Sequence, residues 1–118
     1  MARVLVVDDD DSLRLLYSKE LEGEGYDVES VSSGKQAIES VAVRRPDVVV
    51  LDIKMEGMDG LSALDEIMKM DKTIPVILNT AYSAFKSDFT TWSADAYVVK
   101  SSDLTELKET IKQILQSA

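Results

Sequence analysis

Five polar side chains stand where four apolar runs of the sequence end: Asp8, Asp9, Asp52, Thr80 and Lys100. The runs are short and rich in valine, isoleucine and leucine, a pattern typical of strands buried on both faces of a parallel sheet. All strands of a parallel sheet end on the same side, and ligands of open α/β folds bind outside those carboxyl ends. We therefore expect the five side chains to surround one crevice.

This set of side chains combines three carboxylates, one hydroxyl and one ammonium group. Carboxylates that are packed together repel one another, and at least one takes up a proton unless a cation compensates. Mg²⁺ suits such a site, because this hard ion is held by one or two carboxylates together with waters and a phosphate. With Thr80 as a hydrogen-bond donor and Lys100 as a positive charge, the set has the parts that phosphoryl transfer to a carboxylate needs.

Simpler interpretations exist for the individual carboxylates. Asp52 by itself fits a helix cap or a loop residue. The four consecutive aspartates at positions 8–11 suit a solvated helix N-terminus, which the helix dipole favours. We assign Asp10 and Asp11 to that role. Asp8 and Asp9 lie nearest the strand, so we assign them to the metal.

Predicted strands and helices alternate along the chain. The strands are expected at Val4–Val7, Asp27–Val31, Val48–Leu51, Val76–Leu78 and Tyr97–Val99. The helices are expected at Ser12–Glu24, Ser33–Val43, Leu61–Met70, around Phe85–Trp92 and after Asp103. This alternation implies an α/β fold, in which right-handed crossovers place helices on both faces of a parallel sheet. The second strand has polar neighbours among its valines, which predicts an edge strand.

Apolar spacing also predicts which faces of the helices are buried. In the first helix these residues are Leu13, Leu16, Tyr17 and Leu21. In the second helix they are Ala37, Ile38, Val41 and Ala42. One of the aspartates or Ser12 is expected to cap the first helix. Asp103 with Glu106 resembles a capping box that opens the last helix.

The composition excludes several classes of function. The 118 residues suffice for one domain, and the net charge of −9 argues against direct binding of nucleic acid or of an anionic membrane. The chain has no Cys and no His, which excludes disulfides, thiol or histidine catalysis, and a zinc site built on those residues. The apolar runs are too short for a signal peptide or a membrane span, and we expect a cytoplasmic protein.

Several short motifs together resemble the receiver domain of two-component response regulators, the CheY-like family. The motifs are VVDD at 6–9, LD at 51–52, MDG at 58–60, NTA at 79–81 and YVVK at 97–100. The resemblance covers residues 1–118 and implies one receiver domain. It implies a flavodoxin-like, doubly wound sheet of five parallel strands in the order 2-1-3-4-5, with five helices.

By this resemblance Asp52 is the phosphoacceptor. Mg²⁺ is bound directly by Asp9, Asp52 and the carbonyl of Lys54, and Asp8 acts through water. The phosphoryl donor is a phosphohistidine on a sensor histidine kinase or phosphotransfer protein, or a small donor such as acetyl phosphate. The domain catalyses its own phosphorylation and dephosphorylation, and is a signalling domain rather than an enzyme.

The resemblance gives the remaining site residues a role in switching. Thr80 and Lys100 hold the phosphoryl group, and Tyr97 is the aromatic residue that turns inward as Thr80 moves. The expected result is a changed surface for a downstream protein target or effector domain.

Two departures from the family pattern concern the output surface. Glu56 and Ser101 stand where the family usually has proline. A cis bond before serine costs about 2.5–4 kcal/mol, against about 0.5–1 kcal/mol before proline, so we expect Lys100–Ser101 to be trans. The altered surface leads us to expect a mainly monomeric chain.

Other functions fit the sequence less well. A calcium-binding loop starting at Asp9 has Arg14 where glycine is required. A dinucleotide-binding loop at Gly23 would follow a helix and lacks the third glycine. A phosphatase with an aspartyl-phosphate intermediate commonly has a second aspartate where Lys54 stands. That phosphatase and a receiver-like scaffold that is not phosphorylated are the two alternatives.

Overall fold

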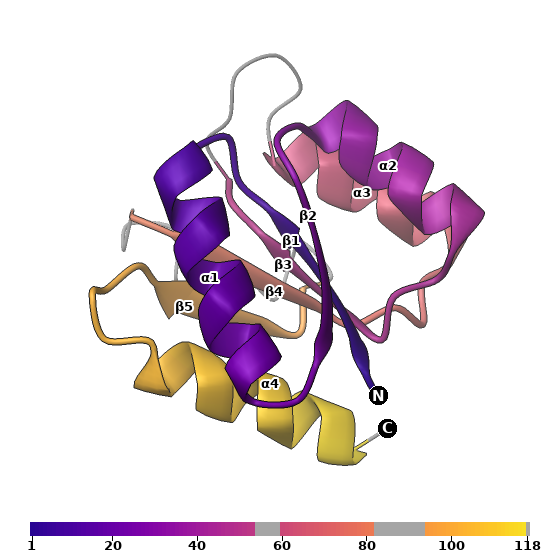
Figure 1. Ribbon diagram of the computed structural model, residues 1–118. Coiled ribbons are helices and arrows are strands. Elements are labelled where there is room, and N and C mark those ends of the chain that lie inside the picture. Colours follow the sequence, from indigo (N-terminus) through magenta and orange to yellow (C-terminus); the bar gives the residue numbers. More distant parts are fainter. Residues whose placement is uncertain (54–59, 82–93, 118) are drawn as a thin grey trace.

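Five parallel strands form one sheet in the order β2-β1-β3-β4-β5, as the resemblance implies (Figure 1). The computed structural model describes residues 1–53, 60–81 and 94–117. The strands are β1 (Arg3–Val7), β2 (Asp27–Val31), β3 (Val48–Leu51), β4 (Val76–Thr80) and β5 (Ala96–Val99). Because every neighbouring pair is parallel, all the strands end at the same edge of the sheet.

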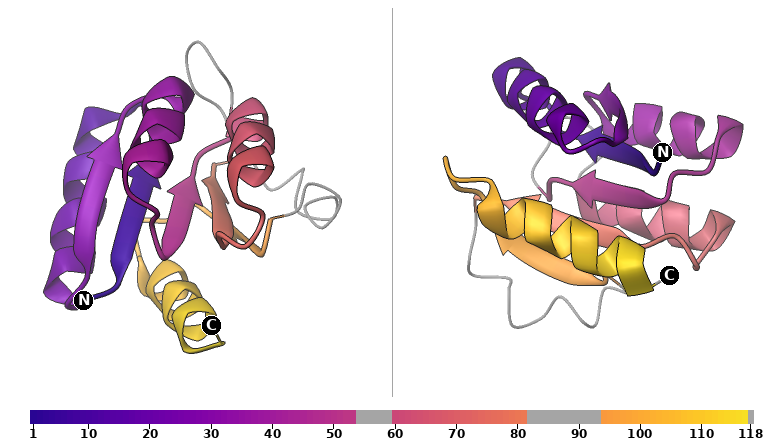
Figure 2. Two further views of the ribbon diagram at one scale, coloured as in Figure 1. Left: turned by 90° about the vertical axis from the view of Figure 1, so that its right-hand side faces the viewer. Right: turned by 60° about the horizontal axis from the view of Figure 1, so that its bottom comes forward.

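Helices cover both faces of this sheet. Within the described ranges they are α1 (Asp11–Gly23), α2 (Gly34–Val43), α3 (Gly60–Met70) and α4 (Thr105–Ser117). Helices α1 and α4 lie on one face, and α2 and α3 lie on the other (Figures 1 and 2). The doubly wound architecture is therefore confirmed. The further helix expected around Phe85–Trp92 lies outside the residues that the structure describes.

Alternation along the strands divides the core into two apolar clusters. Strands β1 and β3 are buried along their whole length. Their even-numbered residues, such as Val6 and Val50, pack with α1 and α4. Their odd-numbered residues, such as Leu5 and Leu51, pack with α2 and α3. Burial on both faces explains the unbroken apolar runs in the sequence.

Short polar side chains begin the helices. The Asp10 carboxylate accepts hydrogen bonds from the backbone N–H groups of Ser12 and Leu13, at 2.9 and 3.1 Å, so the predicted capping of the first helix by an aspartate is confirmed. Ser33 caps α2 in the same way. The Asp103 carboxylate instead accepts from the backbone N–H of Thr105 at 2.9 Å. In a capping box the Asp103 carboxylate would accept from the backbone N–H of Glu106. The predicted capping box of Asp103 and Glu106 was therefore wrong.

Two helix-face predictions are corrected by the structure. Leu16 of α1 is 41% exposed, although its neighbour Tyr17 is fully buried. Ala42 of α2 is exposed, whereas Ala37 and Val41 are buried. In both helices the extra residue lies at the border of the apolar stripe, where spacing alone does not decide burial.

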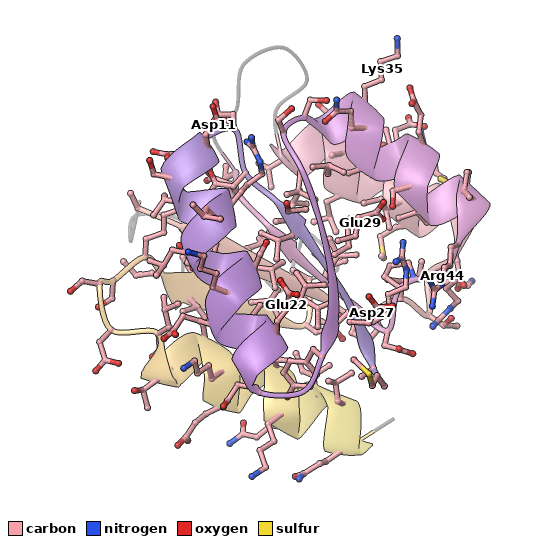
Figure 3. The ribbon with its side chains drawn as sticks, viewed as in Figure 1. Asp11, Glu22, Asp27, Glu29, Lys35 and Arg44 are labelled. Atoms are coloured by element: carbon pink, nitrogen blue, oxygen red, sulfur yellow. The ribbon has the colours of Figure 1, made fainter. Side chains whose placement is uncertain are left out.

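Ion pairs connect the edge strand β2 to neighbouring elements. The guanidinium of Arg3, a mostly buried side chain of β1, lies 2.5 Å from the Glu29 carboxylate of β2. Asp27 of β2 lies 3.4 Å from Arg44, which follows α2 (Figure 3). Strand β2 is only partly buried and lies at the edge of the sheet, as its polar neighbours predicted.

No helix in the described part of the chain is long and apolar enough to cross a bilayer.

Gly60 lies where the chain returns from β3 into α3, and it supplies the first prediction. Its backbone N–H donates to the Ile53 carbonyl at 2.7 Å, and a Cβ there would lie 1.9 Å from the Asp52 carbonyl oxygen. We expect Gly60→Ala to lower the free energy of unfolding by about 1–3 kcal/mol, because the backbone of Asp52 would have to move. Urea denaturation measures this change.

Gly23→Ala is the matched control. A Cβ at Gly23 meets nothing within 4 Å, and the residue lies in the last turn of α1. We expect its free energy of unfolding to stay unchanged or to rise by up to about 1 kcal/mol. Equal effects of the two substitutions would contradict the steric argument.

Candidate functional site

The strand-end side chains meet at the carboxyl edge of the sheet. Asp8 directly follows β1, and Asp52 directly follows β3. Single carboxylate oxygens of Asp8, Asp9 and Asp52 all lie within 4.8 Å of one another. The three acidic side chains that the sequence analysis placed together therefore lie close to one another at this edge.

The backbone holds two of these carboxylates in buried positions. The Asp8 N–H donates to the Val31 carbonyl at 3.2 Å, and the Asp52 N–H donates to the Val7 carbonyl at 3.1 Å. Asp8 is 2% exposed and Asp52 is 6% exposed, whereas Asp9 is exposed. The ladder between β2, β1 and β3 thus sets where the buried acids stand, and Asp9 is the acid that solvent reaches.

Lys100 compensates the charge of both buried acids. Its Nζ lies 2.8 Å from Asp8 Oδ2 and 3.0 Å from Asp52 Oδ2. Burial lowers the pKa of the Lys100 ammonium, but the hydrogen bonds and charges of Asp8 and Asp52 outweigh it, and the pKa is raised above its ordinary value. The lysine is therefore charged at neutral pH. Bringing an ammonium between two buried carboxylates is the central geometric feature of this site.

Strands β4 and β5 carry Thr80 and Tyr97. Thr80, the last residue of β4, is completely buried, and its carbonyl accepts a hydrogen bond from the Lys100 N–H at 2.7 Å. Tyr97 pairs with Leu78 across β4 and β5 and is buried in the core under α2 and α3. Thr80 and Lys100 are thus neighbours at the ends of adjacent strands. Lys54, the remaining predicted residue, lies outside the described residues.

The first turn of α1 adds contacts that the sequence did not reveal. The Asp10 N–H donates to Asp8 Oδ1 at 2.9 Å, and Arg14 Nη1 donates to the Asp8 carbonyl oxygen at 2.7 Å. Arg14 also pairs with Asp11. The sequence shows that Arg14 follows the aspartates, but it does not show that the Arg14 side chain contacts the backbone of Asp8.

The connection after β5 has the predicted backbone form. No cis peptide bond occurs in the described residues, so the Lys100–Ser101 bond is trans. The cost of a cis bond before serine accounts for this outcome.

The donor set determines what the crevice can bind. Carboxylate oxygens are the ligands that hard divalent cations prefer, and the three aspartates each offer one oxygen within 4.8 Å of the others. An ammonium at the same place attracts an anion such as a phosphoryl group. Fold and site together define a doubly wound α/β protein with an acidic, lysine-bearing crevice suited to phosphoryl chemistry.

Comparison with known proteins identifies the family. The model of the response regulator receiver domain matches residues 4–112. The chain therefore belongs to the response regulator receiver domains, which are signalling domains of phosphorelays.

Individual relatives agree with this assignment. The regulatory protein AtoC from Escherichia coli is 36% identical over 116 residues, which are 97% of this chain but 25% of AtoC. Sporulation initiation phosphotransferase F from Bacillus subtilis is 33% identical over 115 residues, covering 96% of this chain and 93% of that protein. The chain thus spans about a quarter of AtoC and nearly the whole of the phosphotransferase.

Solved structures show the same similarity in three dimensions. The response regulator TrrA from Thermotoga maritima, in complex with Mg²⁺-BeF, has a TM-score of 0.91 at 44% identity, covering 97% of this chain and 99% of TrrA. TrrA in complex with the histidine kinase ThkA has a TM-score of 0.90 at 44% identity, covering 98% of this chain and 99% of TrrA.

Charge compensation by Lys100 supplies the second prediction. Lys100→Met leaves two buried carboxylates without a cation, and we expect the free energy of unfolding near neutral pH to fall by about 1.5–3 kcal/mol. The loss should be smaller above the raised pKa of Lys100 than near neutral pH, because the deprotonated lysine no longer compensates the two acids in the unsubstituted chain. In the unsubstituted chain the raised pKa of Lys100 means that its stabilisation is complete below about pH 10.4 and is lost only as the pH rises through the raised value.

Urea denaturation, from neutral pH to above the raised pKa of Lys100, measures this loss. Lys108→Met is the control substitution. Lys108 pairs with Glu20 at 3.3 Å on the surface between α4 and α1. Such a pair contributes about 0–1 kcal/mol, so the control should show a small loss at every pH. A loss in Lys100→Met that does not vary with pH would count against compensation of the two acids.

Proposed function

We propose that Asp52 accepts a phosphoryl group in a Mg²⁺-dependent reaction and that phosphorylation switches a protein-interaction surface. The donor would be a phosphohistidine on a sensor histidine kinase or a phosphotransfer protein, or acetyl phosphate. The observation that carries the proposal is the Lys100 ammonium, 2.8 and 3.0 Å from the buried Asp8 and Asp52. The family, and the complexes of TrrA with Mg²⁺-BeF and with ThkA, support it.

The acidic cluster is the place for the metal. Asp9 and Asp52, together with the carbonyl of Lys54, would hold Mg²⁺, and Asp8 would act through water. The close oxygens of the three aspartates fit this ion. When bound, Mg²⁺ supplies positive charge that offsets the charge of the acids and of the transferring group.

The residues of the chain perform the transfer as follows. A carboxylate oxygen of Asp52 forms a bond to phosphorus, and the bond from phosphorus to the donor's nitrogen or oxygen breaks, its electron pair leaving with the donor. Lys100 and Thr80 hold the phosphoryl oxygens by charge and by a hydrogen bond. Attack of water on the same phosphorus returns Asp52 and releases phosphate. The domain thus catalyses its own phosphorylation and dephosphorylation.

Thr80 and Tyr97 are proposed to transmit the change. A phosphoryl group brings a charge of about −1.5 to −2 and new acceptor oxygens. Tyr97 already lies inward at 6% exposed, and as Thr80 moves toward those oxygens, Tyr97 would shift further into the space that Thr80 leaves. The two arrangements are populations of one molecule, and phosphorylation favours the second. A downstream protein or an effector domain would bind the altered surface.

The remaining expectations are part of the same proposal. Residues 1–118 form one receiver domain. The chain is mainly monomeric, because Ser101 and Glu56 alter the surface through which many receivers dimerise. It acts in the cytoplasm.

Labelling of Asp52 is the third prediction. With Mg²⁺ and acetyl phosphate, we expect intact-mass spectrometry to show one added phosphoryl group, and Asp52→Asn to abolish it, because an amide is not a nucleophile for this reaction. Asp65→Asn is the control, since Asp65 is exposed on α3 and pairs with Lys69 at 3.2 Å. Labelling of Asp52→Asn to the wild-type extent would refute the assignment.

The same experiment distinguishes the two alternatives. A receiver-like scaffold would show no labelling in the wild-type chain. A phosphatase would be labelled and would then turn over the donor continuously, which release of acetate and phosphate measures.

Metal binding by the exposed acid is the fourth prediction. We expect Asp9→Ala to weaken Mg²⁺ binding by about tenfold or more, since changes that only support a metal ligand already cost about 10–100-fold. Isothermal titration of Mg²⁺ measures the affinity, and Asp65→Ala is the control. Because Asp9 is exposed, its replacement should leave the urea denaturation curve nearly unchanged. Unaltered Mg²⁺ affinity in Asp9→Ala would remove Asp9 from the site.

A further inference from the structure

A buried hydrogen bond joins α1 to β4 immediately beneath the site. Asn79 Nδ2 donates to the Tyr17 hydroxyl oxygen at 3.1 Å. Tyr17 is 1% exposed and Asn79 is 3% exposed. The two residues are 62 positions apart in the sequence, so the bond connects segments that only the fold brings together.

Apolar side chains pack around Tyr17. Tyr17 belongs to the cluster between the sheet and helices α1 and α4, together with Val50, Ile77 and Val98. A polar group in such a place has to be hydrogen-bonded, because leaving it without a partner costs the full penalty of removing it from water. The bond therefore holds Tyr17 and Asn79 in one relative position.

That position bears directly on Thr80. Asn79 immediately precedes Thr80 at the carboxyl end of β4. The Thr80 carbonyl in turn accepts the Lys100 N–H at 2.7 Å. Helix α1, which carries Tyr17, begins at Asp11, shortly after Asp8 and Asp9. The Tyr17–Asn79 bond thus ties the helix that follows the two acids to the strand end that carries Thr80.

The Tyr17 phenol is uncharged at neutral pH. Burial raises the pKa of the Tyr17 phenol, against the lowering effect of its hydrogen bond with Asn79. The charge of Lys100 lowers this pKa, and the charges of Asp8 and Asp52 raise it. Tyr17 therefore remains a neutral phenol that can accept the amide hydrogen.

We propose that Tyr17 and Asn79 are positioning residues for phosphoryl transfer, whose hydrogen bond anchors the end of β4 to α1 and so fixes Thr80 relative to Asp52. This inference rests on the proposed function of Asp52 as phosphoacceptor. Neither residue touches the transferring group; both act through Thr80.

Tyr17→Phe is the direct test, because it removes one oxygen and keeps the aromatic ring. The rate constant for labelling by acetyl phosphate at saturating Mg²⁺ should fall about two- to tenfold, the range that one net hydrogen bond represents. The affinity for Mg²⁺, measured by titration, should stay the same, because the acids remain in place. Tyr26→Phe is the matched control, since Tyr26 is a partly buried tyrosine of the same apolar cluster.

Two further variants separate positioning from stability. Tyr17→Phe leaves a buried amide without its partner, so the free energy of unfolding will also fall. Combining Tyr17→Phe with Asn79→Leu removes both polar groups, and should recover most of the stability while the labelling rate stays low. Recovery of the rate together with stability would show a merely structural role and would overturn the proposal.

A double-mutant cycle tests the route through Thr80. Thr80→Val removes the hydroxyl and keeps the shape of the side chain. If Tyr17 acts through Thr80, Tyr17→Phe will slow labelling less in the Thr80→Val background than in the wild type. Equal slowing in both backgrounds would show that Tyr17 does not act through Thr80. Labelling of Tyr17→Phe at the wild-type rate would show that the Tyr17–Asn79 hydrogen bond has no positioning role. Absence of labelling in the wild-type chain would instead refute the proposed function itself.

Discussion

The arrangement of this domain depends on one lysine placed between two buried carboxylates. Asp8 and Asp52 are almost wholly withdrawn from solvent, and two buried carboxylates side by side repel each other unless a cation compensates their charge. Lys100 supplies that charge through contacts of 2.8 and 3.0 Å. A crevice balanced in this way is prepared both for a cation, which the acids attract, and for a phosphoryl group, which the ammonium attracts.

The parallel sheet is what makes this arrangement possible. Strands β1, β3, β4 and β5 are neighbours that all end at one edge, so residues from distant parts of the chain meet there. The ladder hydrogen bonds fix the backbone of Asp8 and Asp52, and the bond between Thr80 and Lys100 fixes the ends of β4 and β5. A site held by strand ends is positioned more accurately than one held by loops.

Helix α1 supports the site from one face of the sheet. Its cap, Asp10, donates its backbone N–H to Asp8, and Arg14 returns to the Asp8 carbonyl. One turn further on, Tyr17 reaches Asn79. A single helix therefore contacts both the strand end that carries the acids and the strand end that carries Thr80, which gives these parts a common frame.

The existence of five strands, the edge that they share and the polar residues at that edge could all be predicted from the sequence, although β1, β4 and β5 are longer than predicted. Runs such as Val48–Leu51 are apolar without interruption because both faces of the strand are buried, and this local signal also placed Asp52. The tertiary structure alone decided that Lys100 bridges Asp8 and Asp52, that Asp9 stays exposed, and that Tyr17 meets Asn79. It also decided that Leu16 and Ala42 face solvent. Periodicity reports only which side of an element is apolar, whereas these contacts depend on distances between elements that are set when the helices pack on the sheet.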